Sequence, residues 1–142
     1  MRQLLARTLR SLEDTRALAR EVLPLLPPGA LVVLEGPLGA GKTTFVGFLA
    51  QALGFQGRVT SPTYTLIHTY PTPEGPLVHA DLYRLKDPTL LLPQLEAAQE
   101  GARLTLVEWG DPEALGAGFL LRLLPEGGVR QAELWQVHPG QE

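Results

Sequence analysis

The fold of this chain is decided by the stretch Gly36-Pro37-Leu38-Gly39-Ala40-Gly41-Lys42-Thr43-Thr44, which follows the pattern G-x-x-x-x-G-K-T. The residues before it, Leu-Val-Val-Leu at 31–34, form a short apolar run that predicts a buried strand. The residues after it carry apolar side chains at helical spacing until Gly54, which predicts a helix with a C-terminal glycine. A strand, a glycine-rich loop and a helix in this order are the context in which the pattern binds phosphate.

The residue types of this stretch suit an anion. Glycines let the backbone curl without Cβ clashes, so that successive N–H groups and the helix N-terminus point at one phosphate. Lys42 is expected to reach the β- and γ-phosphates, and the Thr43 hydroxyl is expected to ligate Mg²⁺. Pro37 removes one donor, but the donors that matter begin near Gly39. The residues expected to bind the nucleotide phosphates are Gly39, Ala40, Gly41, Lys42, Thr43 and Thr44.

Composition narrows the class of protein. A chain of 142 residues fits one domain, so we expect residues 1–142 to form a single domain. There is no cysteine, which excludes disulfides and thiol chemistry, and no apolar run reaches the ~18 residues of a membrane span. Residues 1–5 do not continue into a signal-peptide core, so we expect a cytoplasmic protein that does not bind a membrane. The net charge of −3, without a dense basic run, argues against unaided binding of DNA or other nucleic acid.

The hydrophobic pattern predicts further elements on both sides of the glycine-rich stretch. Their mixture predicts an α/β fold: a P-loop NTPase-like domain whose mixed parallel and antiparallel sheet is flanked by helices. In chain order they are a helix that begins at Ser11 and ends near Pro24, a strand at 64–70, a turn at 71–75 and an antiparallel strand at 77–85. A helix follows that Asp87 caps, Pro93 kinks or delays and Gly101 ends, and then a strand at 104–109. Residues 111–113 open a short helix, and residues 119–124 and 133–137 form a hairpin around a turn at 125–128.

Two acidic residues are candidates for catalysis. Glu108 follows the apolar run at 104–107, and an acid at the end of a strand beside the phosphate loop can hold the Mg²⁺ hydration shell. Asp81 is either a general base that orients water or a strand acid that faces solvent. His79, on the same side of the predicted strand as Asp81, is by itself a packed or surface histidine.

Other polar residues are open to two interpretations. Ser61 and Thr63 form a turn with Pro62, although hydroxyls on a loop near Mg²⁺ can also sense the γ-phosphate. Trp109 is more typical of a core or an interface than of chemistry. Arg84 and Arg130 are possible phosphate partners. Arginine is frequent in this chain, however, so the sequence gives no reason to prefer these two over the other arginines.

Several motifs together resemble one known family, the bacterial TsaE (YjeE) proteins, which are the P-loop ATPases of tRNA threonylcarbamoyladenosine biosynthesis. The resemblance covers roughly residues 11–130. The motifs that carry it are Leu38–Phe45, Leu53-Gly54, Thr60–Leu66, His79–Leu85 and Glu108-Trp109.

The resemblance implies a small mixed α/β domain that binds ATP and Mg²⁺ and works with the TsaD–TsaB modification enzyme. In that family, ATP hydrolysis supports turnover of the complex. The protein would therefore contact tRNA only through the complex and would not itself transfer the threonylcarbamoyl group. By motif, Lys42 and Thr43 would hold phosphate and Mg²⁺, Glu108 would serve the metal, Asp81 would serve hydrolysis, Ser61 and Thr63 would form a switch-like loop, and Trp109 would lie beside the nucleotide.

The chain also departs from that family. Pro37 stands where an acid is common, the Gly110-Asp111 pair after the tryptophan is unusual, and residues 84–102 match no familiar pattern.

Two other classes of protein remain open. A small-molecule or nucleotide kinase would share the phosphate loop, although no paired arginines of a lid are present. A GTP-dependent switch normally reads guanine through Asn-Lys-x-Asp, and the chain has no asparagine.

Overall fold

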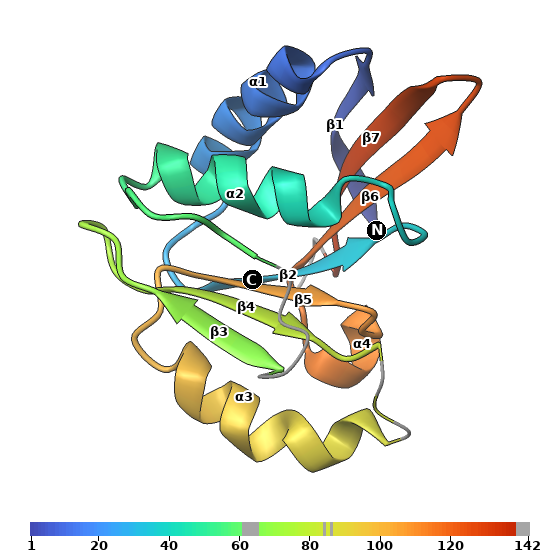
Figure 1. Cartoon of the computed structure of the whole chain (residues 1–142). Coiled ribbons are helices and arrows are strands. Elements are labelled where there is room, and N and C mark those ends of the chain that lie inside the picture. The colour runs from blue at the N-terminus through green and yellow to red at the C-terminus, as the bar shows by residue number, and fades with distance from the viewer. Residues whose placement is uncertain (61–65, 84, 86, 139–142) are drawn as a thin grey trace.

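The computed structural model describes residues 1–60, 66–83, 85 and 87–138. Within these residues, seven strands form one sheet in the order β1-β7-β6-β2-β5-β4-β3 (Figure 1). The strands are β1 Arg2–Leu9, β2 Ala30–Glu35, β3 Ile67–Tyr70, β4 Leu77–Asp81, β5 Leu104–Glu108, β6 Phe119–Glu126 and β7 Val129–Gln136; the α-helices are α1 Leu12–Val22, α2 Lys42–Ala52, α3 Leu92–Gln99 and α4 Pro112–Leu115, and the short 3₁₀ helices are η1 Leu23–Leu25 and η2 Pro88–Leu91.

The sheet is mixed, as the sequence predicted. The central strands β6, β2, β5 and β4 are parallel, whereas β7 and β1 on one side and β3 on the other are antiparallel to their neighbours. Carboxyl ends of parallel strands meet at the same edge of a sheet, which is where open α/β sheets bind ligands. The loop that leaves β2 and the last residues of β4 and β5 therefore share one edge.

Helices cover both faces of the sheet. Figure 1 shows α1 and α2 on one face and α3 on the other. The alternation along β2 explains this layering, because Val32 and Leu34 pack in the core beneath α1 and α2, whereas Leu31 and Val33 pack in the core that contains Leu95 of α3. Among the described residues, no helix has the length and apolar composition of a membrane span.

The predicted helix boundaries are confirmed by their caps. The Ser11 hydroxyl accepts a hydrogen bond from the Asp14 N–H at 3.2 Å, and α1 passes into η1 at Leu23. The Asp87 carboxylate accepts from the Thr89 N–H at 3.1 Å, and a 3₁₀ turn precedes α3, which has Pro93 in its first turn. The proline therefore delays the α-helix, as the sequence indicated.

Three strand predictions need correction. The strand expected at 77–85 ends at Asp81, because its carboxylate accepts the Tyr83 N–H at 2.9 Å and turns the chain. The hairpin strands extend further than expected and leave only residues 127–128 as the turn. Strand β1 was not predicted at all; it pairs antiparallel with β7 along the sheet edge. Of the strand expected at 64–70, residues 64–65 lie outside the described residues and Leu66 precedes the strand; the rest is β3, antiparallel to β4 as predicted.

Candidate phosphate-binding site

The loop between β2 and α2 has the backbone that an anion site needs. Gly39 and Gly41 have φ angles of +80° and +97°, a conformation that residues with a Cβ rarely adopt. Within the described residues, no side chain caps the first turn of α2. Its N–H groups, at the positive end of the helix dipole, therefore remain as donors for an external anion.

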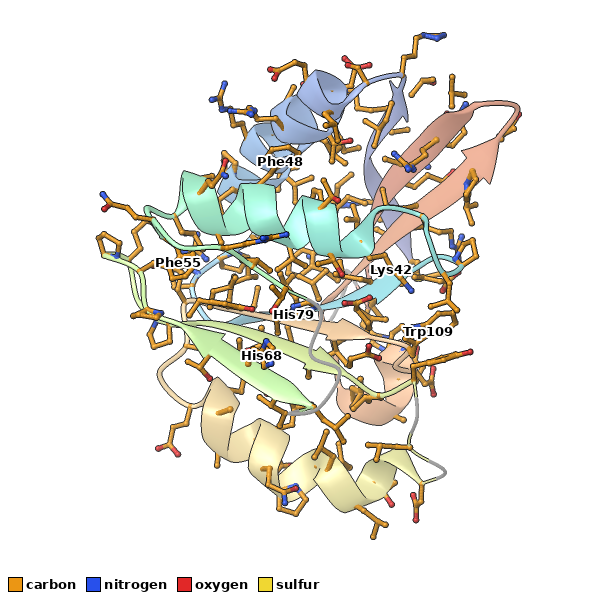
Figure 2. All side chains as sticks on the ribbon, viewed as in Figure 1. Lys42, Phe48, Phe55, His68, His79 and Trp109 are labelled. Atoms are coloured by element: carbon orange, nitrogen blue, oxygen red, sulfur yellow. The ribbon has the colours of Figure 1, made fainter. Side chains whose placement is uncertain are left out.

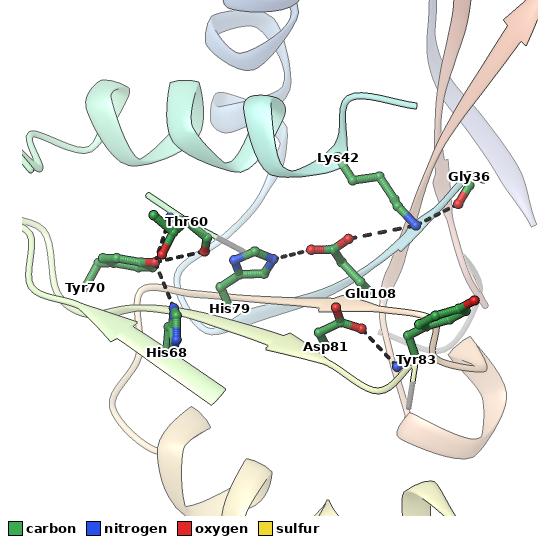
Figure 3. A network of polar contacts seen from close by, with 9 residues as sticks. All are labelled: Gly36, Lys42, Thr60, His68, Tyr70, His79, Asp81, Tyr83 and Glu108. Carbon is green, nitrogen blue, oxygen red and sulfur yellow. Dashed lines mark hydrogen bonds and ion pairs between the residues drawn. The ribbon is translucent and has the colours of Figure 1, made fainter. Parts of the chain in front are cut away.

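Lys42, the first residue of α2, is folded inward at this loop (Figure 3). Its side chain is only 5% exposed; its Nζ donates to the Gly36 carbonyl at 2.6 Å and lies 3.8 Å from Glu108 Oε1. Burial lowers the pKa of Lys42, and the nearby carboxylates of Glu108 and Asp81 oppose that effect. A desolvated ammonium is thus held in place where a phosphate would meet the loop.

Glu108 ends β5 at the sheet edge that faces Lys42. The residue is buried, and its Oε2 lies 2.5 Å from Nε2 of His79 on the neighbouring strand β4. Because the other oxygen, Oε1, is the one nearest Lys42, the two contacts fix the plane of the carboxylate. The glutamate therefore lies where the sequence predicted an acid beside the phosphate loop.

His79 is the residue of this cluster whose role the sequence did not reveal. It is fully buried, as one interpretation expected, but it is hydrogen-bonded to a candidate metal ligand. Its Nδ1 has no partner among the described residues, so we assign the proton to Nε2, which donates to Glu108. The signal that could have identified it is its position on β4, two residues before Asp81 and on the same face.

Asp81 lies directly beside Glu108 in the register of β4 and β5. It is half-buried, and its Oδ1 accepts the Tyr83 N–H, which fixes the direction of the carboxylate. The two candidate acids therefore end adjacent parallel strands and face the same loop.

Trp109 closes the cluster on the solvent side. Its φ of +65° is unusual for a residue with a side chain. The Lys42 ammonium lies 3.8 Å from the centroid of its ring, and the Tyr83 ring packs against it at 4.8 Å. Figure 2 shows Lys42 and Trp109 near each other where α2 begins. The indole therefore shields the lysine by a cation–π contact.

The side chains of Lys42, Asp81, Glu108 and Trp109 line a cleft of about 310 Å³. Of the residues expected at the site, Ala40 does not line it, because its side chain is buried in the core and its N–H donates to the Pro37 carbonyl at 3.1 Å. Ser61 and Thr63 lie outside the described residues. Arg130, which the sequence could not separate from other arginines, does line the cleft. The lining residues are Leu38, Gly39, Gly41, Lys42, Thr43, Thr44, Asp81, Glu108, Trp109 and Arg130.

The donor set of this cleft fits a phosphate chain with Mg²⁺. The ammonium of Lys42, the guanidinium of Arg130 and the free N–H groups of α2 suit an anion. The hydroxyl of Thr43 and the carboxylate of Glu108 are hard oxygen donors, and Mg²⁺ typically takes one or two carboxylates and completes its shell with water and phosphate.

Comparison with known proteins gives a consistent result. The family model described as "Threonylcarbamoyl adenosine biosynthesis protein TsaE" matches residues 9–125. A protein of Aquifex aeolicus named "tRNA threonylcarbamoyladenosine biosynthesis protein TsaE" is 51% identical over 81 residues, which are 56% of this chain and 61% of that protein. A protein of Bacillus subtilis with the same name is 42% identical over 109 residues, which are 77% of this chain and 68% of that protein.

A solved structure is similar over nearly the whole chain. The crystal structure of YdiB from the same Bacillus species superposes with a TM-score of 0.71 and 29% sequence identity. The similarity covers 96% of this chain and 88% of that one. The mixed sheet with helices on both faces is thus an arrangement that a known protein shares.

Proposed function

The chain belongs to the TsaE family, and on that premise we propose that it is a Mg²⁺-dependent ATPase that supports the formation of threonylcarbamoyladenosine on tRNA. The observation that carries the proposal is the convergence of Lys42, Glu108 and Asp81 on the loop that precedes α2. A cation at the loop and two carboxylates at the ends of adjacent strands are what phosphoryl transfer to water requires.

Each residue of the cluster has a distinct task in this proposal. Lys42 binds phosphate oxygens, and its burial strengthens that electrostatic contact because less water screens it. Thr43 and Glu108 would hold Mg²⁺, and His79 keeps the Glu108 carboxylate in one orientation. When bound, Mg²⁺ neutralises charge on the phosphate oxygens. Asp81, oriented by the Tyr83 N–H, positions water and accepts its proton.

We infer that the partners of this activity are the TsaD and TsaB proteins and that tRNA is met through them. Two observations support this inference. The relatives are named for the biosynthesis of a tRNA modification. The net charge of −3 does not favour direct binding of nucleic acid by this chain alone. Ser61 and Thr63 keep their expected role as a nucleotide-sensing loop as part of the proposal.

The proposal is tested by removing the two residues at the centre of the site. Lys42→Ala removes the buried cation and Thr43→Ala the hydroxyl ligand, so each is expected to reduce MgATP affinity at least tenfold, to judge from typical charge-assisted hydrogen bonds. Isothermal titration calorimetry measures the affinity and phosphate release measures turnover. Arg20→Ala, an exposed arginine on α1, is the control. Unchanged affinity and turnover in both variants would exclude this site, and transfer of phosphate to an added acceptor would favour a kinase.

A further inference from the structure

A second hollow of the surface, the α2 groove, lies between α2 and residues 57–59. Its volume is about 370 Å³. Its lining follows α2 from Thr43 and Thr44, which also line the phosphate cleft, to Gln51. The groove therefore continues from the phosphate cleft along the helix.

The floor of the α2 groove contains a glycine that the packing of the helix does not require. Gly47 lies in the middle of α2, where glycine is less favourable than alanine. Within the described residues, a Cβ placed on Gly47 would meet only the Cβ of Val59, at an ordinary contact distance of 3.9 Å. An alanine would therefore fit and favour the helix. The effect of the glycine is to leave the groove open.

Arg16 of α1 approaches the groove from one side. Phe48, next to Gly47, is half-buried and projects from α2 toward α1 (Figure 2). The Arg16 guanidinium lies 5.0 Å from the centroid of the Phe48 ring, which holds the guanidinium in place and leaves its edge as a donor. Its acidic neighbour Glu13, at 3.7 Å, is 79% exposed, so water screens that ion pair.

Arg58 supplies a positive charge on the other side. It is exposed, lines the α2 groove and has no acidic partner in the part of the chain that the structure describes. Phe48 and Gln51 lie between the two arginines, because they line both the groove and a smaller pocket that Arg16 borders. An apolar floor with a cation on each side is complementary to carboxylates that have an apolar neighbour.

The same features favour a protein segment over nucleic acid. Nucleic-acid binding depends on the neutralisation of several phosphates, whereas this groove offers two arginines on a chain with a net charge of −3. The Phe48 ring already stacks with Arg16, which leaves less of it for a base. The apolar floor of Gly47, Phe48 and Val59 instead suits an aliphatic side chain.

We propose that the α2 groove binds an acidic segment of the protein partner of this chain. Arg16 and Arg58 contact carboxylates of that segment, and an apolar side chain of the segment enters over Gly47. The assignment rests on the proposed function and adds to it a surface on which the partner docks. It places the partner beside Thr43 and Thr44, at the helix that begins in the phosphate cleft.

The test measures the affinity of TsaD–TsaB for the full chain in MgATP, by biolayer interferometry at low and at high salt. Arg58→Glu reverses one charge of the groove and is expected to weaken binding at least about tenfold at low salt, and less at high salt. Gly47→Met places an apolar side chain in the groove and is expected to weaken binding to a similar extent; Gly47→Ala replaces it should the methionine variant not fold. Arg2→Glu, at an exposed arginine of β1, is the matched control and should leave the affinity unchanged.

Calorimetric MgATP affinity of each isolated variant separates docking from damage to the fold or to the phosphate cleft. It should stay unchanged in Arg58→Glu and Gly47→Met, because neither residue lines that cleft. Loss of MgATP affinity in these variants would overturn the assignment, since the groove would then belong to the nucleotide site.

The remaining outcomes separate the assignment from the proposed function. Unchanged TsaD–TsaB affinity in both variants would overturn the assignment and leave the proposed function standing. Reduced binding of unmodified tRNA to Arg58→Glu, with unchanged TsaD–TsaB affinity, would overturn it in favour of an RNA surface. Failure of the unmutated chain to bind TsaD–TsaB would instead overturn the partners in the proposed function, and the assignment with them.

Discussion

At the residue scale, the site depends on the buried carboxylate of Glu108, each oxygen of which contacts a different residue. Glu108 receives a hydrogen bond from His79 on one oxygen and faces the Lys42 ammonium with the other. A buried charge is tolerated only when it is paired and hydrogen-bonded, and both conditions are met here. Asp81, beside it in register and half-buried, has a different environment, and the proposed function gives it a different task.

Isosteric amides should separate the tasks of the two acids. Glu108→Gln removes the charge expected at the metal, so its ATPase activity should require more Mg²⁺. Asp81→Asn should keep nucleotide affinity within a few-fold and reduce turnover by roughly 10²–10⁴-fold, the usual effect of a general base. Turnover as a function of Mg²⁺ and calorimetric MgATP affinity measure the two effects. Wild-type turnover of both variants at limiting Mg²⁺ is the result that this division of tasks does not allow.

His79 should act on stability and on the metal together. His79→Leu leaves a buried carboxylate oxygen without its donor, which costs about 1–3 kcal/mol of unfolding free energy. His79→Gln can donate from its amide and should restore part of both stability and Mg²⁺ dependence. Urea unfolding and Mg²⁺ titration of the ATPase measure the two effects. His68→Leu, which removes a hydrogen bond to Tyr70 away from the cleft, is the control and should leave Mg²⁺ dependence unchanged.

At the element scale, the edge strand β1 supports the strand that carries Arg130. It pairs with β7 over most of its length, from Arg2 opposite Gln136 to Leu9 opposite Arg130. Its side chains are mostly exposed or half-buried, and only Leu9 is buried. The strand is therefore held by backbone pairing with β7 and by the packing of Leu4, Leu5 and Leu9 against the core.

Removal of β1 should weaken the fold measurably. Cross-strand pairs contribute roughly 0.2–1 kcal/mol each, so deletion of residues 2–8, which removes six pairs with β7, is expected to lower the unfolding free energy by about 1–6 kcal/mol. It should also weaken nucleotide binding, because β7 would become a free edge next to Arg130. Urea unfolding and calorimetry measure the two losses. An unchanged urea midpoint would show that β1 is not part of the stable sheet.

The same elements show what could be predicted from the sequence. The phosphate loop, β2, α2 and the acid at the end of β5 were predicted because their signals are local: a spacing of glycines, an apolar run, a helical period. Strand β1 was missed because its exposed residues leave no alternation and its partner β7 is distant in sequence. Arg130 and His79 were not assigned a role for a related reason. Only the strand order brings Arg130 to Gly41 and His79 to Glu108.

At the scale of the whole molecule, the site lies at one edge of the sheet and is bordered by exposed apolar side chains. Leu38, which lines the cleft, is 68% exposed, and Tyr83, which packs against Trp109 of the cleft, is 50% exposed. A partner that covers this edge would exclude water from the phosphates and fix the position of Asp81. The chain alone should therefore hydrolyse ATP slowly, and a partner that binds the ATP state more tightly than the ADP state would let hydrolysis drive association and release.

The central claim, that this chain is an ATPase coupled to tRNA modification, is tested most directly in a reconstituted mixture with TsaD, TsaB and tRNA. The measurement is the ATP hydrolysis rate with and without TsaD–TsaB, for the unmutated chain and for Lys42→Ala, together with the affinity of TsaD–TsaB for the chain in MgATP and in MgADP. The account predicts that TsaD–TsaB stimulates hydrolysis, that the stimulated rate is lost in Lys42→Ala, and that the complex binds more tightly in MgATP. Equal affinity in the two nucleotides, with no stimulation and no effect of Lys42→Ala, would contradict it.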